Sequence, residues 1–243
     1  MLTIFFAAIG AVVLAQRSRL GAIAMTLGLP MIGIGLSFPE VRTAAGLAAV
    51  MIGGAIYACL VSLAWPERPP PPDPAGQPAP PTRSYGIRLG AAGATAAAIG
   101  FAFDFDHVGW ACAAALLVMR PSAEMQQLRS VGRIVSVAAG AAVAIGVVRL
   151  EPADVWFSVA VLVTIATVAG THRSRWYITP AFTTFLVFVL LLYAAPDQAT
   201  ARFGERMGET VLGVALAYLY GLLIPHLRAR IADRKVGPPS SGP

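Results

Sequence analysis

Charged side chains are scarce in this sequence. Asp, Glu, Lys and Arg together make up 12% of the 243 residues, whereas 57% of the residues are apolar. A chain of this composition has too little polar surface to enclose its apolar side chains in one water-soluble core, so it needs lipid as its solvent. We therefore expect a membrane protein whose principal partner is the lipid bilayer.

Cysteine is nearly absent as well. Cys59 and Cys112 both lie inside apolar stretches, and the sequence has no Cys-x-x-Cys pair and no Cys/His cluster. Isolated cysteines in apolar surroundings usually serve packing, so neither a disulfide nor a metal site is expected. The motifs Gly-x-Ser-x-Gly and His-Glu-x-x-His and the P-loop are also missing. We expect neither an enzyme nor a cofactor, and no direct ATP hydrolysis by this chain.

What the sequence has is a series of apolar segments. A bilayer span requires about 20 mostly apolar residues. Nine segments qualify as candidates, with the first and fifth short: 2–15, 20–38, 43–65, 85–103, 107–119, 133–149, 155–171, 176–195 and 208–225. We expect an all-α polytopic transmembrane helix bundle of about nine spans.

The basic residues gather in alternate loops between these segments. One set of loops holds 14 of the 18 Lys and Arg residues but 4 of the 12 acidic residues: 16–19, 66–88, 120–133, 172–175 and 226–243. Basic loops face the cytoplasm, which predicts a cytoplasmic C-terminus and an external Met1. The net charge of +6 is spread over segment edges and is not interleaved with aromatic residues, so no nucleic-acid partner is expected.

A proline-rich stretch divides the chain. Residues 66–83 contain nine prolines, a composition that favours an extended, semi-rigid spacer. The segments before it follow the same order of landmarks as residues 155–225, with Pro66 matching Pro225, which indicates an internal repeat. We predict four parts: a partial three-helix module at 1–65, a cytoplasmic linker at 66–84, a complete six-helix module at 85–227, and a basic, then disordered, cytoplasmic tail at 228–243.

The region after the linker carries a recognisable pattern: a Trp-led helix that ends in Arg-Pro, a short polar loop, an Arg that opens a glycine-bearing helix, and two later helices. The stretches are DHVGW at 106–110, LVMRPS at 117–122, Arg129 and Arg133 with Gly140, YITPAFTTF at 177–185, and RMGETVLGVALAYLYG at 206–221. Over residues 85–227 this pattern resembles the fusaric acid resistance protein-like (FUSC, aromatic acid exporter) family.

The resemblance implies two six-helix modules in the bacterial inner (plasma) membrane and export of small aromatic carboxylic acids or similar organic anions. Because the front module has three helices, we expect an N-terminally truncated form of a twelve-helix transporter. The alternatives are a non-transporting membrane scaffold and an inactive fragment. A homo-oligomer or a membrane-fusion partner would suit an efflux component.

Transporters built from repeats often bind substrate where helices are broken by proline or glycine. Pro30 and Pro180 are the helix-break candidates, although they lie at different depths. Thr183 and Thr184 follow Pro180 by one turn, so they could contact a substrate carboxylate or bond to carbonyls of their own helix.

Trp110, Arg120 and Arg133 are candidates for the substrate path. Cytoplasmic arginines can concentrate organic anions, but most serve as topology signals. Arg133 is the best exception, because it opens a helix at a position of the family pattern. Trp110 could line an aromatic path or belong to the interfacial belt of aromatic residues.

Asp104, Asp106, His107 and Glu209 are candidates for a proton relay. The first three could equally form a solvated loop. The spacing of Arg202, Glu205, Arg206 and Glu209 predicts paired charges at the start of the last span.

Overall fold

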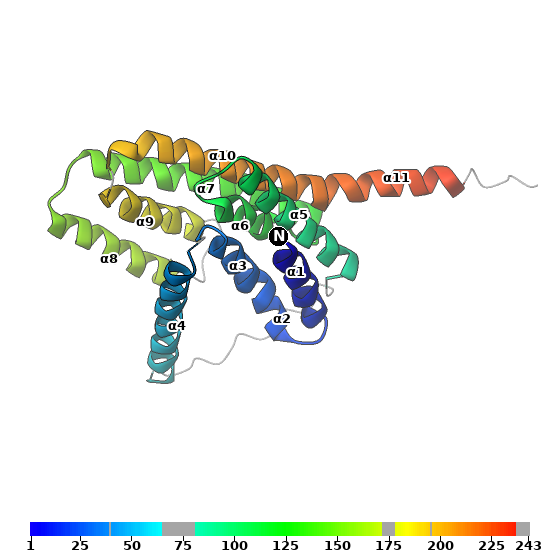
Figure 1. Cartoon of the computed structure of the whole chain (residues 1–243), viewed down its shortest axis with the longest axis horizontal. Helices are drawn as coiled ribbons and strands as arrows, with labels where there is room; N and C mark the ends of the chain where they lie inside the picture. The colour runs from blue at the N-terminus through cyan, green and yellow to red at the C-terminus, as the bar shows by residue number, and fades with distance from the viewer. Residues whose placement is uncertain (39, 65–80, 172–177, 195, 237–243) are drawn as a thin grey trace, which may run out of the picture.

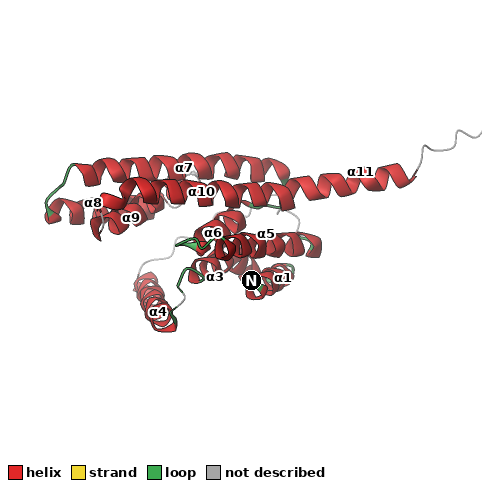
Figure 2. Cartoon of the chain, turned by 45° about the horizontal axis from the view of Figure 1, so that its top comes forward, coloured by secondary structure: helices red, strands yellow, loops and turns green. Residues whose placement is uncertain are grey.

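The computed structural model describes residues 1–38, 40–64, 81–171, 178–194 and 196–236. These residues form nine helical rods and no strand (Figure 2). The elements are α1 (Leu2–Ala15), α2 (Arg19–Ile23), a π-turn (Ala24–Gly28), α3 (Leu29–Gly35), α4 (Val41–Ala64), α5 (Arg83–Ala102), α6 (Val108–Val118), α7 (Ala123–Arg149), α8 (Asp154–Thr171), α9 (Ile178–Ala194), a 3-10 turn (Pro196–Gln198), α10 (Ala199–Tyr218), a second π-turn (Leu219–Leu223) and α11 (Ile224–Val236). The predicted all-α helical bundle is confirmed.

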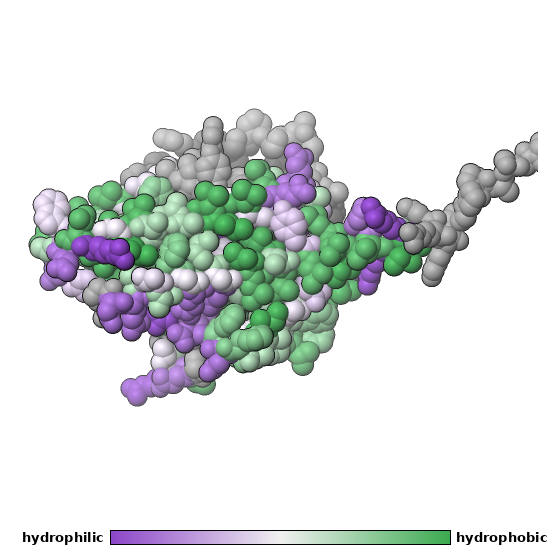
Figure 3. All heavy atoms as spheres, turned by 90° about the horizontal axis from the view of Figure 1, so that it is seen from above, coloured by the Kyte–Doolittle hydropathy of each residue, from purple (hydrophilic) through white to green (hydrophobic). Residues whose placement is uncertain are grey.

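Length and composition let three helical stretches cross a bilayer: Val41–Val61, Ala123–Arg149 and Ala199–Ile231. Five other apolar helices have 10–17 residues, among them α1 and α6. Hydrophobic side chains dominate the face shown in Figure 3, and hydrophilic ones gather in patches. Such a surface suits contact with lipid.

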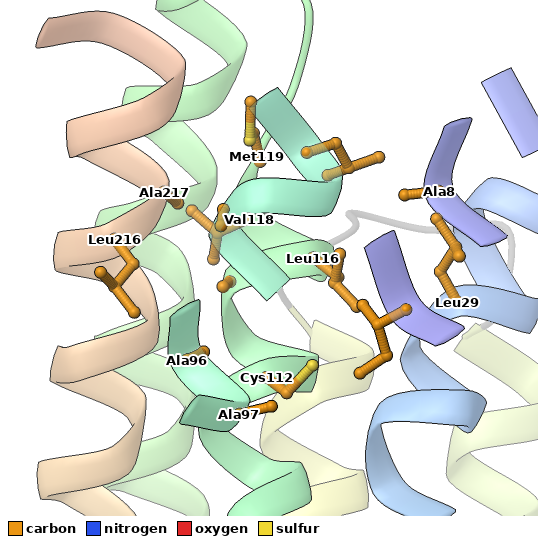
Figure 4. Packing of buried hydrophobic residues seen from close by; sticks show 14 of the residues in the cluster. Ala8, Leu29, Ala96, Ala97, Cys112, Leu116, Val118, Met119, Leu216 and Ala217 are labelled. Atoms are coloured by element: carbon orange, nitrogen blue, oxygen red, sulfur yellow. The ribbon is translucent and has the colours of Figure 1, made fainter. Parts of the chain in front are cut away.

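The short helix α6 lies at the centre of the main core. It packs against α3, α5 and α10, and nearly all of its side chains are buried. In Figure 4, Leu116 of α6 lies between Ala217 of α10 on one side and Leu29 of α3 on the other. The helix ends at Val118 because Pro121 disfavours helical backbone in the residue before it, and Met119 is already extended. This early end frees the segment 119–122 to turn into α7.

Glycine permits the close approach of α10 to α6. A Cβ atom at Gly213 would clash with the backbone around Ala111 and Ala115 and with the side chain of Ala114. Helices in membranes often associate through such small residues. A second core joins α7, α8 and α9, and there Gly140 of α7 lies against the backbone of α9 at Ala181.

Two helices contain a π-turn, and each turn ends two residues before a proline. The turn Ala24–Gly28 precedes Pro30, and the turn Leu219–Leu223 precedes Pro225. Proline lacks a backbone donor and its ring clashes with the carbonyl four residues earlier, so a wider turn relieves the clash. Pro180 is the third residue of α9, in a first turn where proline is tolerated.

Several predicted features lie partly or wholly outside the described residues: the linker from 66 to 80, the basic loop 172–175, and the tail after 236. The described beginning of that tail is helical, since α11 runs to Val236. α11 projects beyond the bundle, and α4 stands apart from it (Figure 1). Of the described α4 side chains, all but Ala44 are exposed.

Candidate functional site

A charged cluster joins the loop between α5 and α6 to the first half of α10. The Arg202 guanidinium donates to Asp106 at 2.7 Å and to Glu205 at 3.0 Å. Glu205 also contacts Nδ1 of His107 at 3.0 Å. Asp104 is exposed, with a positive φ of 52°. The structure thus links Asp106 and His107 to α10, whereas Asp104 faces outward.

This cluster also has the geometry of a cation site. The ligand atoms of Asp106, His107 and Glu205 lie within 4.8 Å of one another. Arg202 contacts two of these groups, so its guanidinium offsets part of their negative charge. The chemistry of the cluster therefore favours an internal ion-pair network over a metal site.

Trp110 connects the cluster to the interior of the bundle. Its ring stacks on the His107 ring, with centroids 4.1 Å apart and planes inclined by 14°. The Arg206 guanidinium lies 4.3 Å from the centroid of the same Trp110 ring, in cation–π geometry. Trp110 is therefore in contact both with His107 of the charged cluster and with Arg206 in the interior of the bundle.

Glu209 lies one turn of α10 beyond Glu205 and Arg206. Its exposed fraction is 2%, and neither carboxylate oxygen has a hydrogen-bond partner among the described residues. The spacing-based prediction that Arg206 pairs with Glu209 is not met at hydrogen-bond distance, because Arg206 turns toward Trp110. The prediction for Arg202 and Glu205 is met.

Arg133 reaches the same interior from within α7. The prediction that Arg133 opens a helix is wrong, because α7 already begins at Ala123. The positive charge of Arg133 disfavours the charge of Arg206. The Nε atoms of both arginines are buried and lack a hydrogen-bond partner within the described parts of the chain. A small cavity of about 80 Å³ lies beside Arg133, lined by Leu117, Val118, Arg129, Arg133 and Pro180. The helix-break candidate Pro180 and the substrate-path candidate Arg133 thus share one cavity.

The other candidates lie elsewhere. Thr183 donates to the Thr179 carbonyl of its own helix at 3.0 Å, and Thr184 is buried against Gly140. Pro30 is buried in α3, whose neighbours are α1 and α6. Thr183, Thr184 and Pro30 are not among the residues that line the cavity beside Arg133.

Arg120 belongs to a separate polar group at the opposite end of α6. Its guanidinium donates to the Met119 carbonyl at 2.8 Å, and the Tyr85 hydroxyl donates to the same oxygen at 3.1 Å. Burial lowers the pKa of Arg120 from its ordinary value, while Tyr85 opposes that change. An arginine at the end of a helix also stabilises the negative end of the helix dipole.

The fusaric acid resistance protein-like family model matches residues 95–220. This chain belongs to that family. No curated protein and no solved structure matches the chain. The matched region of this fusaric acid resistance protein-like chain includes Trp110, Arg133, Arg206 and Glu209. With its apolar helices, the chain is a membrane protein of a transport or resistance type.

Sequence reasoning missed two residues of this region. Arg206 was assigned to an ion pair on α10, because helical spacing does not reveal the neighbouring Trp110 ring. Gln126 was overlooked, although it is fully buried and donates to the Ala217 carbonyl at 2.7 Å. A polar amide on an otherwise apolar helical face was the available signal.

Proposed function

We propose that this fusaric acid resistance protein-like chain exports small organic anions, with aromatic carboxylic acids as the substrate class. Its proposed location is the bacterial inner membrane, with the C-terminus in the cytoplasm. The observation that carries the proposal is the pair formed by Arg133 and Arg206. Each guanidinium has a buried Nε atom without a hydrogen-bond partner among the described residues, and the charge of Arg133 acts on Arg206.

Such a pair is expensive to maintain without a functional reason. A charge inside the membrane is costly, and two like charges add repulsion to that cost. A carboxylate would offset both, because guanidinium groups bind carboxylates through strong, bidentate hydrogen bonds. We therefore assign the binding of the substrate carboxylate to Arg133 and Arg206.

The aromatic part of the substrate has a partner in the same place. Trp110 offers an indole ring beside Arg206. Aromatic rings attract one another in offset or edge-to-face arrangements, so a benzoate-like ring could pack there while its carboxylate meets the arginines. Arg120 then lies before the site, and its positive charge would attract anions into the path.

Coupling to protons is a second part of the proposal. The charged cluster holds together His107, Asp106 and Glu205, and Trp110 lies between His107 and the interior of the bundle. Histidine and carboxylate groups exchange protons near neutral pH when their surroundings allow it. We propose that this cluster exchanges protons with the external solution during export.

The test measures retention of labelled benzoate in cells that express the full chain. We expect Arg133→Gln and Arg206→Gln each to slow efflux by about tenfold or more, because hydrogen bonds to charged groups contribute about 1.5–3 kcal/mol. Arg149→Gln is the matched control, since Arg149 is exposed in the last turn of α7. Equal efflux by cells with and without the chain would refute the proposed function.

A further inference from the structure

The carboxylate of Glu209 is an internal anion next to the arginine pair. It is buried, it has no hydrogen-bond partner in the described residues, and it interacts electrostatically with Arg206. Its own helix also carries Glu205, and the loop between α5 and α6 carries Asp106. Glu205, Arg206 and Asp106 are thus the charged groups that act on Glu209 in the described structure. Arg133, on α7, acts on Arg206.

The outer two carboxylates each have a charged partner. Arg202 binds both Asp106 and Glu205, and His107 contacts Glu205. Glu209 has no such partner. Taken alone, Arg133, Arg206 and Glu209 sum to one positive charge when Glu209 is ionised and to two when it is neutral, so loss of the Glu209 charge makes this site more positive by one.

We propose that Glu209 sets the charge of the organic anion that this site accepts, so that its ionised carboxylate selects monoanions over dianions. A single carboxylate neutralises a site of net charge +1, whereas a dianion would leave an excess negative charge in an apolar surrounding. Such an excess is costly because the membrane interior cannot solvate it. Removing the charge of Glu209 makes the site more positive by one charge and therefore favours a dianion.

This inference rests on the proposed binding of carboxylates by Arg133 and Arg206. It adds a specificity-determining role for a residue that need not touch the substrate. At an effective dielectric constant of about 20, even a unit charge about 12 Å away changes the binding of an ion by roughly tenfold. The expected effect is therefore large enough to measure.

The experiment compares binding of benzoate, a monoanion, and isophthalate, a dianion with the same ring, to the full chain purified in lipid nanodiscs. Carboxyl groups on such rings are fully ionised at about pH 7 and about pH 9, so any change in preference between variants comes from the protein. At about pH 9, where a protein carboxyl group is most fully ionised, we expect Glu209→Gln to raise the isophthalate-to-benzoate affinity ratio by about tenfold.

Three further variants complete the test. Glu209→Met removes the same charge, suits an apolar surrounding and replaces Glu209→Gln if that variant does not assemble. Glu209→Asp keeps the charge, so its preference should match that of the wild type. Glu124→Gln removes an exposed carboxylate in the first turn of α7 and should also leave the preference unchanged.

The outcomes separate the two proposals. A wild-type protein that binds neither probe would overturn the proposed function and, with it, this inference. A wild-type protein that binds benzoate with an affinity ratio equal to that of the charge-removing variants at both pH values would overturn the role of Glu209 alone. A tenfold change confined to those variants would support it.

Discussion

The side-chain amide of Gln126 donates a 2.7 Å hydrogen bond to the backbone carbonyl of Ala217. This bond ties the first turn of α7 to α10 just before the π-turn Leu219–Leu223. The π-turn shifts the helical hydrogen-bond pattern, and a side-chain donor can satisfy a carbonyl in such a region. Gln126 also accepts a bond from the Arg120 backbone at 3.3 Å, so one amide joins three segments.

We expect Gly221→Ala to weaken this junction. A Cβ atom at Gly221 would overlap the side-chain amide of Gln126, which would have to move and give up its bond to Ala217. Leaving a buried polar group unsatisfied costs about 1–3 kcal/mol. Thermal unfolding of the purified protein should show a lower midpoint than that of the wild type.

Gly208→Ala is the control for that substitution. Gly208 lies on α10 with open space around its Cβ position. Alanine favours a helix over glycine by about 1 kcal/mol, so this variant should be equally stable or more stable. A loss of stability for Gly208→Ala equal to that for Gly221→Ala would contradict the role of Gln126.

A second prediction concerns the contact between α6 and α10. Gly213→Ala should separate the two helices, because the new methyl group would meet the Ala111 and Ala115 backbone. Backbone atoms cannot turn away as a flexible side chain can, so we expect a destabilisation of about 1–3 kcal/mol. Gly204→Ala, where nothing lies near the Cβ position, should not show it. Equal unfolding midpoints for the two variants would argue against close packing at Gly213.

The Met119 carbonyl provides a third prediction, since it accepts from both Tyr85 and Arg120. Tyr85→Phe should cost about 0.5–1.5 kcal/mol, because the arginine still satisfies the carbonyl. Arg120→Gln combined with Tyr85→Phe should cost more than the two single changes together. A double-mutant cycle on unfolding free energies measures the difference. Strict additivity would show that the two donors act independently.

A fourth prediction concerns the prolines behind the π-turns. Replacing Pro225 with Ala removes the clash that widens the turn, so a regular α-helical turn should form over Leu219–Leu223. Amide hydrogen exchange in this segment should become slower, because the π-turn's poorer hydrogen bonds are replaced. Pro30→Ala should have the same effect on Ala24–Gly28. Pro180→Ala, in the first turn of α9, should leave exchange in both segments unchanged.

The helices were predictable because composition and hydropathy determine which segments must avoid water. The family was also predictable, since Trp110, Arg120 and Arg133 occupy recognisable positions in the sequence. The surroundings of each charged side chain could not be predicted from the sequence. Helical spacing brought Arg206 next to Glu209, but tertiary packing turned it toward Trp110. Spacing along one helix cannot register a ring supplied by another helix.

The prolines show the same limit. Pro30 was noticed because glycines surround it, whereas Pro225 was read only as the end of a segment. In the structure both prolines follow a five-residue π-turn, and each turn ends two residues before its proline. The sequence shows where a regular helix is disfavoured. Whether the helix then breaks, kinks or forms a wider turn depends on the packing of neighbouring helices.

The continuous rod formed by α10, its π-turn and α11 extends for 38 residues, from Ala199 to Val236. At 1.5 Å per residue it is about 57 Å long, nearly twice the thickness of a hydrocarbon core of about 30 Å. The part from Leu219 to Val236 is about 27 Å long. A change of about 10° in the bend at the π-turn would therefore move the far end of this rod by about 5 Å, so a small adjustment beside Gln126 corresponds to a large displacement at Val236.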